Sequence, residues 1–399
     1  MSTQAPRLPR LPVLGWEALR DPRPSPTDCM LDLPRMRFTT SGRAAILLAL
    51  EVIGVSAEDT VLLPTYHCPT MVAPVVECRA TPVFYPIDHN GAPLFAWLDA
   101  LDLRQVKAIL VPHFFGVPQA MASVRLWCDA RGIALIEDCA HALFGRSDGR
   151  PIGTWGDVAI GSLTKFLPVS EGGCLVINNG GPAPRLRHGN AKVQLKAALD
   201  ILEEGARHGR LPGLSALVCG TLDALRGLRR TGAPLPPGPP TQMASPVSDA
   251  SFTLDLQLAH RAMAGPCVWV ARLLPRARIV ELRRHNYRRL AQRLSGHLGL
   301  QPLRAELPPE CAPYVFPVWV DVPDPGYAEL RRLNMPVFRW DRLWPGMPSI
   351  DGDHGLSWSH HVLQLACHQD LRDDDIDHFA DVVLRLFAGA PASGHATGR

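Results

Sequence analysis

The sequence predicts an α/β protein with a mostly parallel central sheet, because three observations agree. Short apolar runs alternate with stretches of helical periodicity through the first half of the chain. These runs are continuously apolar, which is typical of strands that are buried on both faces of a sheet. The 399 residues are 46% hydrophobic and 20% charged, a globular composition with room for more than one domain.

The first half of the chain supplies the large sheet. We expect its strands at residues 60–64, 81–88, 106–113, 133–138, 157–163 and 174–178. We expect helices at residues 41–55, 68–78, 96–102 and 121–132. Because ligands bind beyond the carboxyl ends of parallel strands, the residues that follow each strand are the first candidates for a site.

The second half predicts a smaller α/β domain. Helical patterns cover 183–230 and 254–300, strands are expected at 314–322 and 335–340, and a closing helix at 374–387. Residues 231–248 form a proline-rich connector without periodicity. We therefore expect an N-terminal extension (1–40), a large domain (41–245), a smaller C-terminal domain (249–387) and a disordered tail (388–399).

Charge and cysteine usage narrow the class of protein. The 41 basic and 38 acidic residues are mixed along the chain, which gives no electrostatic footprint for nucleic acid or an anionic membrane. No apolar run is long enough to cross a bilayer, and the first residues do not resemble a signal peptide. The ten cysteines form no C-x-x-C pair. We therefore expect reduced thiols, a cytoplasmic protein and no metal site.

Two candidate sites follow from helix starts and strand ends. Ser41 and Gly42 open a helix, whose free N–H groups and dipole favour a phosphate; an ordinary N-cap is the alternative. Asp138 ends an apolar strand, where a carboxylate is costly to bury without a partner. It can hold a protonated ring nitrogen, or it can cap the next helix.

Two further candidates complete the set. Lys165 lies among small and apolar residues, and a lysine whose pKa is lowered by its surroundings can form a Schiff base with a carbonyl. Ser162 lies three residues earlier and can bind a phosphate on the same ligand. Tyr66 and His67 follow another strand and can stack on a planar ring. The alternatives are an exposed loop lysine and simple packing.

All four candidates fit one ligand. Pyridoxal phosphate needs a lysine for its aldehyde, a carboxylate for its ring nitrogen and donors for its phosphate. A nucleotide-binding α/β protein is the alternative outside this cofactor. The chain has neither G-x-G-x-x-G after its first strand nor G-x-x-x-x-G-K-[ST], which counts against that alternative.

These residues resemble the DegT/DnrJ-type sugar aminotransferases, a branch of the fold-type I pyridoxal-phosphate enzymes. The resemblance runs from about residue 40 to 387 and rests on stretches 41–68, 108–142, 162–179 and 365–383. It implies that Lys165 is the Schiff-base lysine and Asp138 the partner of the pyridine nitrogen. It implies that Ser162, Gly42 and Arg43 lie near the phosphate.

The chain departs from the family pattern at several positions. His141 stands where the family has Gln, near the phenolic oxygen of the cofactor. Arg43 replaces a Thr, and the serine precedes the lysine by three residues where the family often has five. Cys68 occupies the place of the stacking aromatic, so that Tyr66 or His67 would serve instead. The family's Asn-Tyr-Arg segment has no clear match. These departures concern the substrate more than the cofactor.

The resemblance implies a homodimeric aminotransferase that moves an amino group from an amino acid to a keto-sugar. We expect glutamate as the donor and a nucleotide-linked sugar as the acceptor. Arg339 and Arg342 are candidates for contacting the donor carboxylate or the acceptor phosphate; a solvated basic pair is the alternative. Another pyridoxal-phosphate reaction on a non-sugar acceptor, or a non-catalytic regulatory protein, stays open. The presence of Lys165 argues against the sugar dehydratase branch, where His replaces the lysine.

Overall fold

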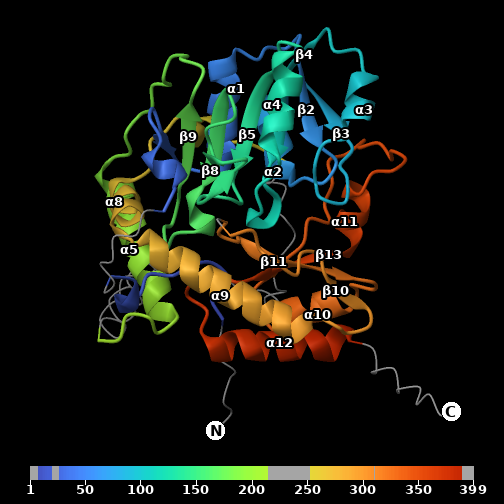
Figure 1. Ribbon diagram of the computed structural model, residues 1–399. Helices are drawn as coiled ribbons and strands as arrows, with labels where there is room; N and C mark the ends of the chain where they lie inside the picture. Colours follow the sequence, from blue (N-terminus) through green and yellow to red (C-terminus); the bar gives the residue numbers. More distant parts are fainter. Residues whose placement is uncertain (1–7, 20–26, 214–251, 310, 389–399) are drawn as a thin grey trace, which may run out of the picture.

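The computed structural model describes residues 8–19, 27–213, 252–309 and 311–388, and it contains two main sheets (Figure 1). In the view of Figure 1 the larger sheet lies in the upper half of the molecule. The smaller sheet lies in the lower half, together with the long helices α9 (Arg276–Leu294) and α12 (Asp373–Phe387).

The larger sheet has seven strands in the order β1-β9-β8-β5-β4-β2-β3. Its strands are β1 (Arg37–Thr39), β2 (Thr60–Pro64), β3 (Thr81–Tyr85), β4 (Val106–Pro112), β5 (Ala134–Cys139), β8 (Val158–Ser162) and β9 (Gly173–Ile177). Strands β3, β2, β4, β5 and β8 pair in parallel, whereas β9 pairs antiparallel with both β8 and β1.

Helices cover both faces of this sheet because successive side chains of a strand point to opposite faces. Val61 and Leu63 pack with α1 (Gly42–Ile53) and α2 (Pro69–Glu77). Leu62, between them, packs on the other face, which α3 (Phe95–Asp99) and α4 (Met121–Asp129) cover together with α8 (Gly265–Leu273). Two-sided burial explains why the strands read as continuous apolar runs.

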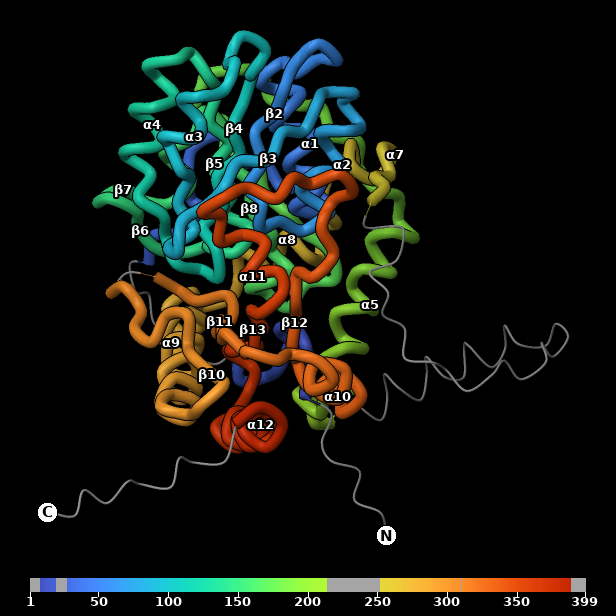
Figure 2. The backbone as a smooth tube through the Cα atoms, turned by 90° about the vertical axis from the view of Figure 1, so that its right-hand side faces the viewer, coloured from blue at the N-terminus to red at the C-terminus, as the bar shows by residue number. Residues whose placement is uncertain are grey.

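The smaller sheet is antiparallel, with the order β10-β11-β13-β12. Its strands are β10 (Leu300–Pro302), β11 (Val315–Val320), β12 (Val337–Phe338) and β13 (Val362–Ala366). One face packs on α9, α10 (Gly326–Arg332) and α12 around a core of its own. The remaining elements are α5 (Ala191–Arg207), α7 (Leu256–Ala259), α11 (Gly355–His361) and a hairpin of β6 (Arg146–Ser147) and β7 (Arg150–Pro151). Figure 2 shows α5 and α7 along one side of the molecule.

The strands and helices of the first half agree with the predicted elements to within a few residues, and the helical stretch predicted over 254–300 is divided into shorter elements. That stretch forms three helices, α7, α8 and α9, followed by β10. Pro266 is the second residue of α8 and Pro275 caps α9, and a proline cannot supply the N–H that a continuous helix requires at those places. Strands β1, β6, β7, β10 and β13 were not predicted.

The predicted division into domains stays a prediction. The connector 231–248 and residues 389–399 of the predicted tail lie outside the described residues. The predicted boundary at residue 41 falls between β1 and α1. In the described part of the chain, no helix is both long and apolar enough to cross a membrane.

Candidate active site

A cavity of about 560 Å³ lies where the two sheets meet. The larger sheet contributes the carboxyl ends of β5 and β8 and the N-terminus of α1. The opposite side comes from residues around β11, β12 and β13. The cavity brings together most of the predicted site residues: Ser41, Gly42, Arg43, Asp138, His141, Ser162 and Lys165.

Asp138 lies near the end of β5 and is almost fully buried. Its Oδ1 accepts a hydrogen bond of 2.8 Å from the backbone N–H of Ala140. Its Oδ2 is buried and has no hydrogen-bond partner among the described residues. Burial raises the pKa of Asp138, because the charged form loses its hydration. A buried carboxylate oxygen without a partner is costly, so this atom suits a ligand that brings a proton or a positive charge.

Lys165 ends a short 3₁₀ helix, Leu163–Lys165, that directly follows β8. Its Nζ lies 5.2 Å from the centre of the Tyr314 ring. Burial lowers the pKa of Lys165, while the Asp138 carboxylate acts in the opposite direction. Its carbonyl oxygen accepts a hydrogen bond of 2.7 Å from the buried guanidinium of Arg283. The side chain is therefore held at the cavity in surroundings that favour a neutral amine.

The start of α1 is brought against β8 and β9 by glycines. Ser41 caps the helix, and its Oγ accepts from the N–H of Ala44. A Cβ on Gly42 would lie 3.2 Å from the Cβ of Ser162. A Cβ on Gly173 would lie 2.3 Å from the carbonyl of Ser41. This close packing explains why residues 42 and 173 are glycines. It also leaves a helix N-terminus beside the Ser162 hydroxyl, an arrangement that suits a phosphate.

Arg43 also lines the cavity, and its guanidinium donates to the carbonyl of Thr253. His141 is buried between two rings, 4.5 Å from that of Tyr314 and 4.9 Å from that of Trp340. Burial lowers the pKa of His141 well below its usual value. Its Nδ1 accepts from the N–H of Phe115, so the neutral ring carries its proton on Nε2. His141 can therefore donate one hydrogen bond from Nε2.

Tyr66 and His67 do not line the cavity, so the expectation that one of them stacks on a ligand ring is not supported by the structure. The Tyr66 ring is packed among Phe114, Phe115, Trp340 and Trp358. His67 stacks on Phe84, and its Nε2 accepts from the N–H of Trp344. Cys68, one residue further along, lines the cavity instead.

Neither Arg339 nor Arg342 lines the cavity. Arg339 forms a 2.7 Å ion pair with Asp324 and donates to the carbonyl of His360. Its neighbours Phe338 and Trp340 line the cavity, because alternate residues of an extended segment point to opposite sides. Arg342 is exposed. The predicted contacts of these arginines with substrate therefore stay a prediction that the cavity lining does not support.

Sequence reasoning missed the side of the cavity that the smaller sheet supplies. Tyr314, Phe338, Trp340 and Gln364 line it. The only signal in the sequence was the alternation of aromatic and charged residues at 338–340. In an extended segment, either Arg339 or its two aromatic neighbours can face the cavity, and the sequence does not show which. Gln364 lies inside an apolar strand, and nothing in its local pattern marks it as a binding residue.

Comparison with known proteins finds a family model that matches part of the chain. Residues 38–199 match the model of the DegT/DnrJ/EryC1/StrS aminotransferase family. The matched segment contains Asp138, Ser162, Lys165 and the start of α1, which confirms the resemblance found in the sequence.

Two curated relatives show how far the similarity extends. The chain is 33% identical over 145 residues to GDP-perosamine synthase of Vibrio cholerae, covering 35% of this chain and 39% of that protein. It is 31% identical over 213 residues to L-glutamine:2-deoxy-scyllo-inosose aminotransferase of Streptomyces kanamyceticus, covering 49% and 50%. The chain thus spans about half, or less, of the length of these curated relatives.

A solved structure of an aminotransferase from Psychrobacter cryohalolentis covers more of the chain. It matches with a TM-score of 0.60 and 18% identity over 89% of this chain and 88% of that chain. The likeness confirms the predicted fold-type I architecture with its mostly parallel central sheet.

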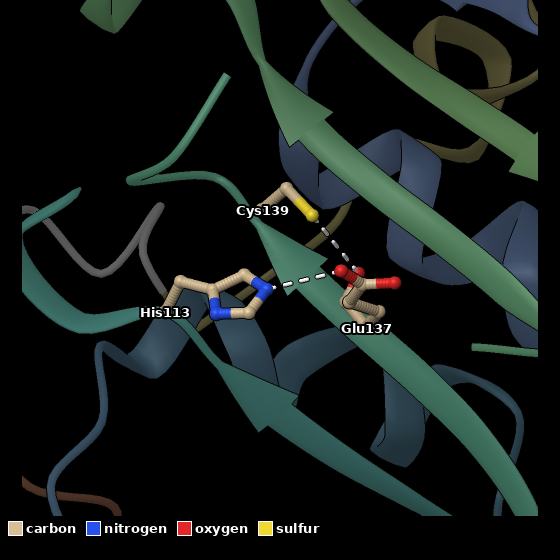
Figure 3. Close-up of side chains that lie close together, drawn as sticks. All are labelled: His113, Glu137 and Cys139. Atoms are coloured by element: carbon tan, nitrogen blue, oxygen red, sulfur yellow. Dashed lines mark hydrogen bonds and ion pairs between the residues drawn. The ribbon is translucent and has the colours of Figure 1, made fainter. Parts of the chain in front are cut away.

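His113, which follows β4, and Glu137 and Cys139 of β5 form a buried cluster (Figure 3). His113 Nδ1 accepts from the N–H of Gln119, so His113 Nε2 donates to Glu137 Oε1 at 3.0 Å. The other donors to the Glu137 carboxylate are the N–H groups of residues 153, 155 and 156. Each oxygen has two donors, so the cluster acts as a hydrogen-bond centre that fixes the loop after β7 against β5.

Proposed function

We propose that the protein is a pyridoxal-phosphate-dependent aminotransferase that moves an amino group from an amino acid to a keto-sugar. One observation carries the proposal: Asp138 lines the same cavity as Lys165, and its buried Oδ2 has no hydrogen-bond partner among the described residues. A carboxylate kept without a partner is otherwise a cost to stability, and it suits the protonated nitrogen of a pyridine ring.

The remaining cavity residues fit the rest of the cofactor. The N–H groups that open α1 and the hydroxyl of Ser162 suit its phosphate. Lys165 suits its aldehyde, and the Nε2–H of His141 suits its phenolic oxygen. Cys68, Ala140 and Ile160 line the same cavity and offer small or apolar contacts to a flat ring.

The bound cofactor would supply an electron sink for the carbon next to the transferred nitrogen. Asp138 would keep the ring nitrogen protonated, because its Oδ2 has no other donor among the described residues. Lys165 would take up the proton of the donor's α-carbon at Nζ and later return it. Burial favours this role, because it lowers the pKa of the amine and makes the neutral base available.

The substrates are inferred from the relatives. GDP-perosamine synthase and the inosose aminotransferase carry names that refer to an amino sugar and to a cyclitol ketone, which supports a polyhydroxylated ketone as the acceptor. The amino donor is glutamate or glutamine; the second is the donor named for the inosose enzyme. We further propose a homodimer, in keeping with the fold-type I architecture.

The donor half of the reaction tests this proposal. Purified protein with added pyridoxal phosphate is mixed with glutamate or glutamine and no acceptor, and the absorbance spectrum and the keto acid are followed. We expect about one keto acid per site and a matching spectral change, both lost in Lys165→Ala. A wild-type protein that binds the cofactor and forms no keto acid from any proteinogenic amino acid would contradict the proposal and favour a non-catalytic role.

A further inference from the structure

The side of the cavity formed by the smaller sheet is aromatic. Tyr314 precedes β11, Phe338 ends β12, and Trp340 follows it. The rings of Tyr314 and Phe338 lie 6.1 Å apart, and that of His141 lies between Tyr314 and Trp340 at 4.5 and 4.9 Å. We call Tyr314, Phe338, Trp340 and Gln364 the aromatic-amide wall.

This wall lies directly beside the reacting lysine. Lys165 Nζ is 5.2 Å from the centre of the Tyr314 ring. Any carbonyl carbon that reacts next to Lys165 therefore brings the atoms around it against Tyr314 and its neighbours. A substrate bound there must offer an apolar face to the rings.

Gln364 gives the wall one polar atom. It is fully buried in β13, opposite Phe338 of β12. Its Nε2 donates to the Tyr66 hydroxyl at 2.9 Å, and its Oε1 has no partner among the described residues. If the amide is turned over, Tyr66 donates to Oε1 and the NH₂ group is left without a partner. A ligand hydroxyl suits both orientations, because it can donate as well as accept.

The wall itself is uncharged. Arg339 lies between two of its members, but its guanidinium is turned away to Asp324. Arg43, Asp138, Lys165 and Asp255, the charged residues described at the cavity, all come from outside the smaller sheet. The wall therefore offers apolar surface and one amide, and it offers no ion pair for a phosphate or carboxylate.

We propose that the aromatic-amide wall is the subsite for the acceptor ring, and that it selects a polyhydroxylated six-membered ring. The ring's apolar C–H face would lie on Trp340 and Tyr314, and one ring hydroxyl would bind the amide of Gln364. This inference rests on the proposed function for the identity of the acceptor. The same ring can come from a free cyclitol or from a nucleotide-linked sugar.

Binding without turnover tests the wall. Saturation-transfer NMR is run on the protein with added pyridoxal phosphate and two unreactive probes, myo-inositol and UDP-glucose. The variants Trp340→Leu and Gln364→Met remove a ring and the amide. Trp319→Leu and Gln301→Met make the same changes on the same sheet at positions that do not line the cavity. We expect ring C–H signals with the wild type and both controls, and a loss of affinity of about tenfold or more in the wall variants.

The two probes show whether the cavity binds a free ring or a ring that is linked to a nucleotide. Signals from myo-inositol identify a free ring as sufficient; hexose signals only from UDP-glucose identify a nucleotide-linked ring. Absence of ring signals for both probes with the wild type overturns the subsite, and so do equal losses in wall and control variants. The donor half-reaction is measured separately, so its failure with intact ring binding contradicts the reaction and leaves the subsite standing.

Discussion

Arg283 provides the most detailed prediction, because a fully buried guanidinium supports the active-site backbone. It donates to the carbonyl of Lys165 at 2.7 Å, to that of Pro313 at 3.0 Å and to Gln369 Oε1 at 2.8 Å. It also lies 4.4 Å from the centre of the Phe166 ring. Burial lowers the pKa of Arg283 to about 10. Its charge is therefore balanced mainly by carbonyl groups, two of which belong to the segments that present Lys165 and Tyr314.

We expect Arg283→Met to destabilise the fold by about 3–5 kcal/mol, because it leaves buried acceptors without a donor. Removing the desolvated charge offsets part of this cost. Urea unfolding monitored by circular dichroism measures the change. Arg284→Met is the matched control, because the neighbouring Arg284 is only partly buried and its guanidinium bonds to the carbonyls of Pro308 and Cys311. We expect it to cost about 1 kcal/mol.

Arg283 also donates to the Lys165 carbonyl, so its replacement should change the rate of the reaction as well as the stability. Where Arg283→Met still folds, we expect a slower proton transfer at Lys165 and a lower kcat, with no comparable change in Arg284→Met. A loss of stability below about 1 kcal/mol in Arg283→Met, or equal effects in both variants, would refute the reasoning.

Three further predictions concern single residues of the site. Asp138→Asn should raise the free energy of unfolding of the cofactor-free protein at pH 8 by about 1 kcal/mol, because burial disfavours the charged carboxylate and raises the pKa of Asp138. The gain should fade as the pH falls through that raised pKa, since the wild-type carboxyl then becomes neutral. Pyridoxal-phosphate binding to the same variant should weaken; tighter binding would contradict the assigned role. Glu137→Ala should lower the free energy of unfolding, measured in urea, by about 3–5 kcal/mol, because four buried donors lose their acceptor. A change near zero would show that the cluster is dispensable for stability. Gly173→Ala should weaken cofactor binding more than Gly42→Ala. The new Cβ at residue 173 would lie 2.3 Å from the Ser41 backbone, whereas a Cβ at residue 42 would lie 3.2 Å from the Ser162 Cβ. Titration of each variant with the cofactor, followed by absorbance, measures the two affinities.

The larger sheet and the side of the cavity that holds Asp138 and Lys165 were predictable because both follow from local chemistry. Buried parallel strands read as continuous apolar runs, and the ends of two such runs carry Asp138 and Lys165. Gly42 and Ser41 open a helix with an ordinary capping pattern. A carboxylate and a lysine at the ends of buried strands, together with a helix start, fit few ligands other than pyridoxal phosphate.

The substrate side was not predictable, because it depends on which way each side chain points. Tyr66 and Cys68 differ by two residues, yet one packs behind the cavity and the other lines it. Arg339 and Trp340 are adjacent, and their directions depend on how the segment after β12 meets the larger sheet. Gln364 reaches the cavity only through the pairing of β13 with β12, which joins segments that no local pattern connects.

Covalent trapping tests the central claim, that Lys165 and Asp138 form a pyridoxal-phosphate site, most directly. The protein is incubated with pyridoxal phosphate, reduced with borohydride, digested and mapped by mass spectrometry. We expect one phosphopyridoxyl group, on Lys165, with weaker labelling in Asp138→Asn at limiting cofactor. A label on another lysine, or wild-type protein that takes up none, would contradict it.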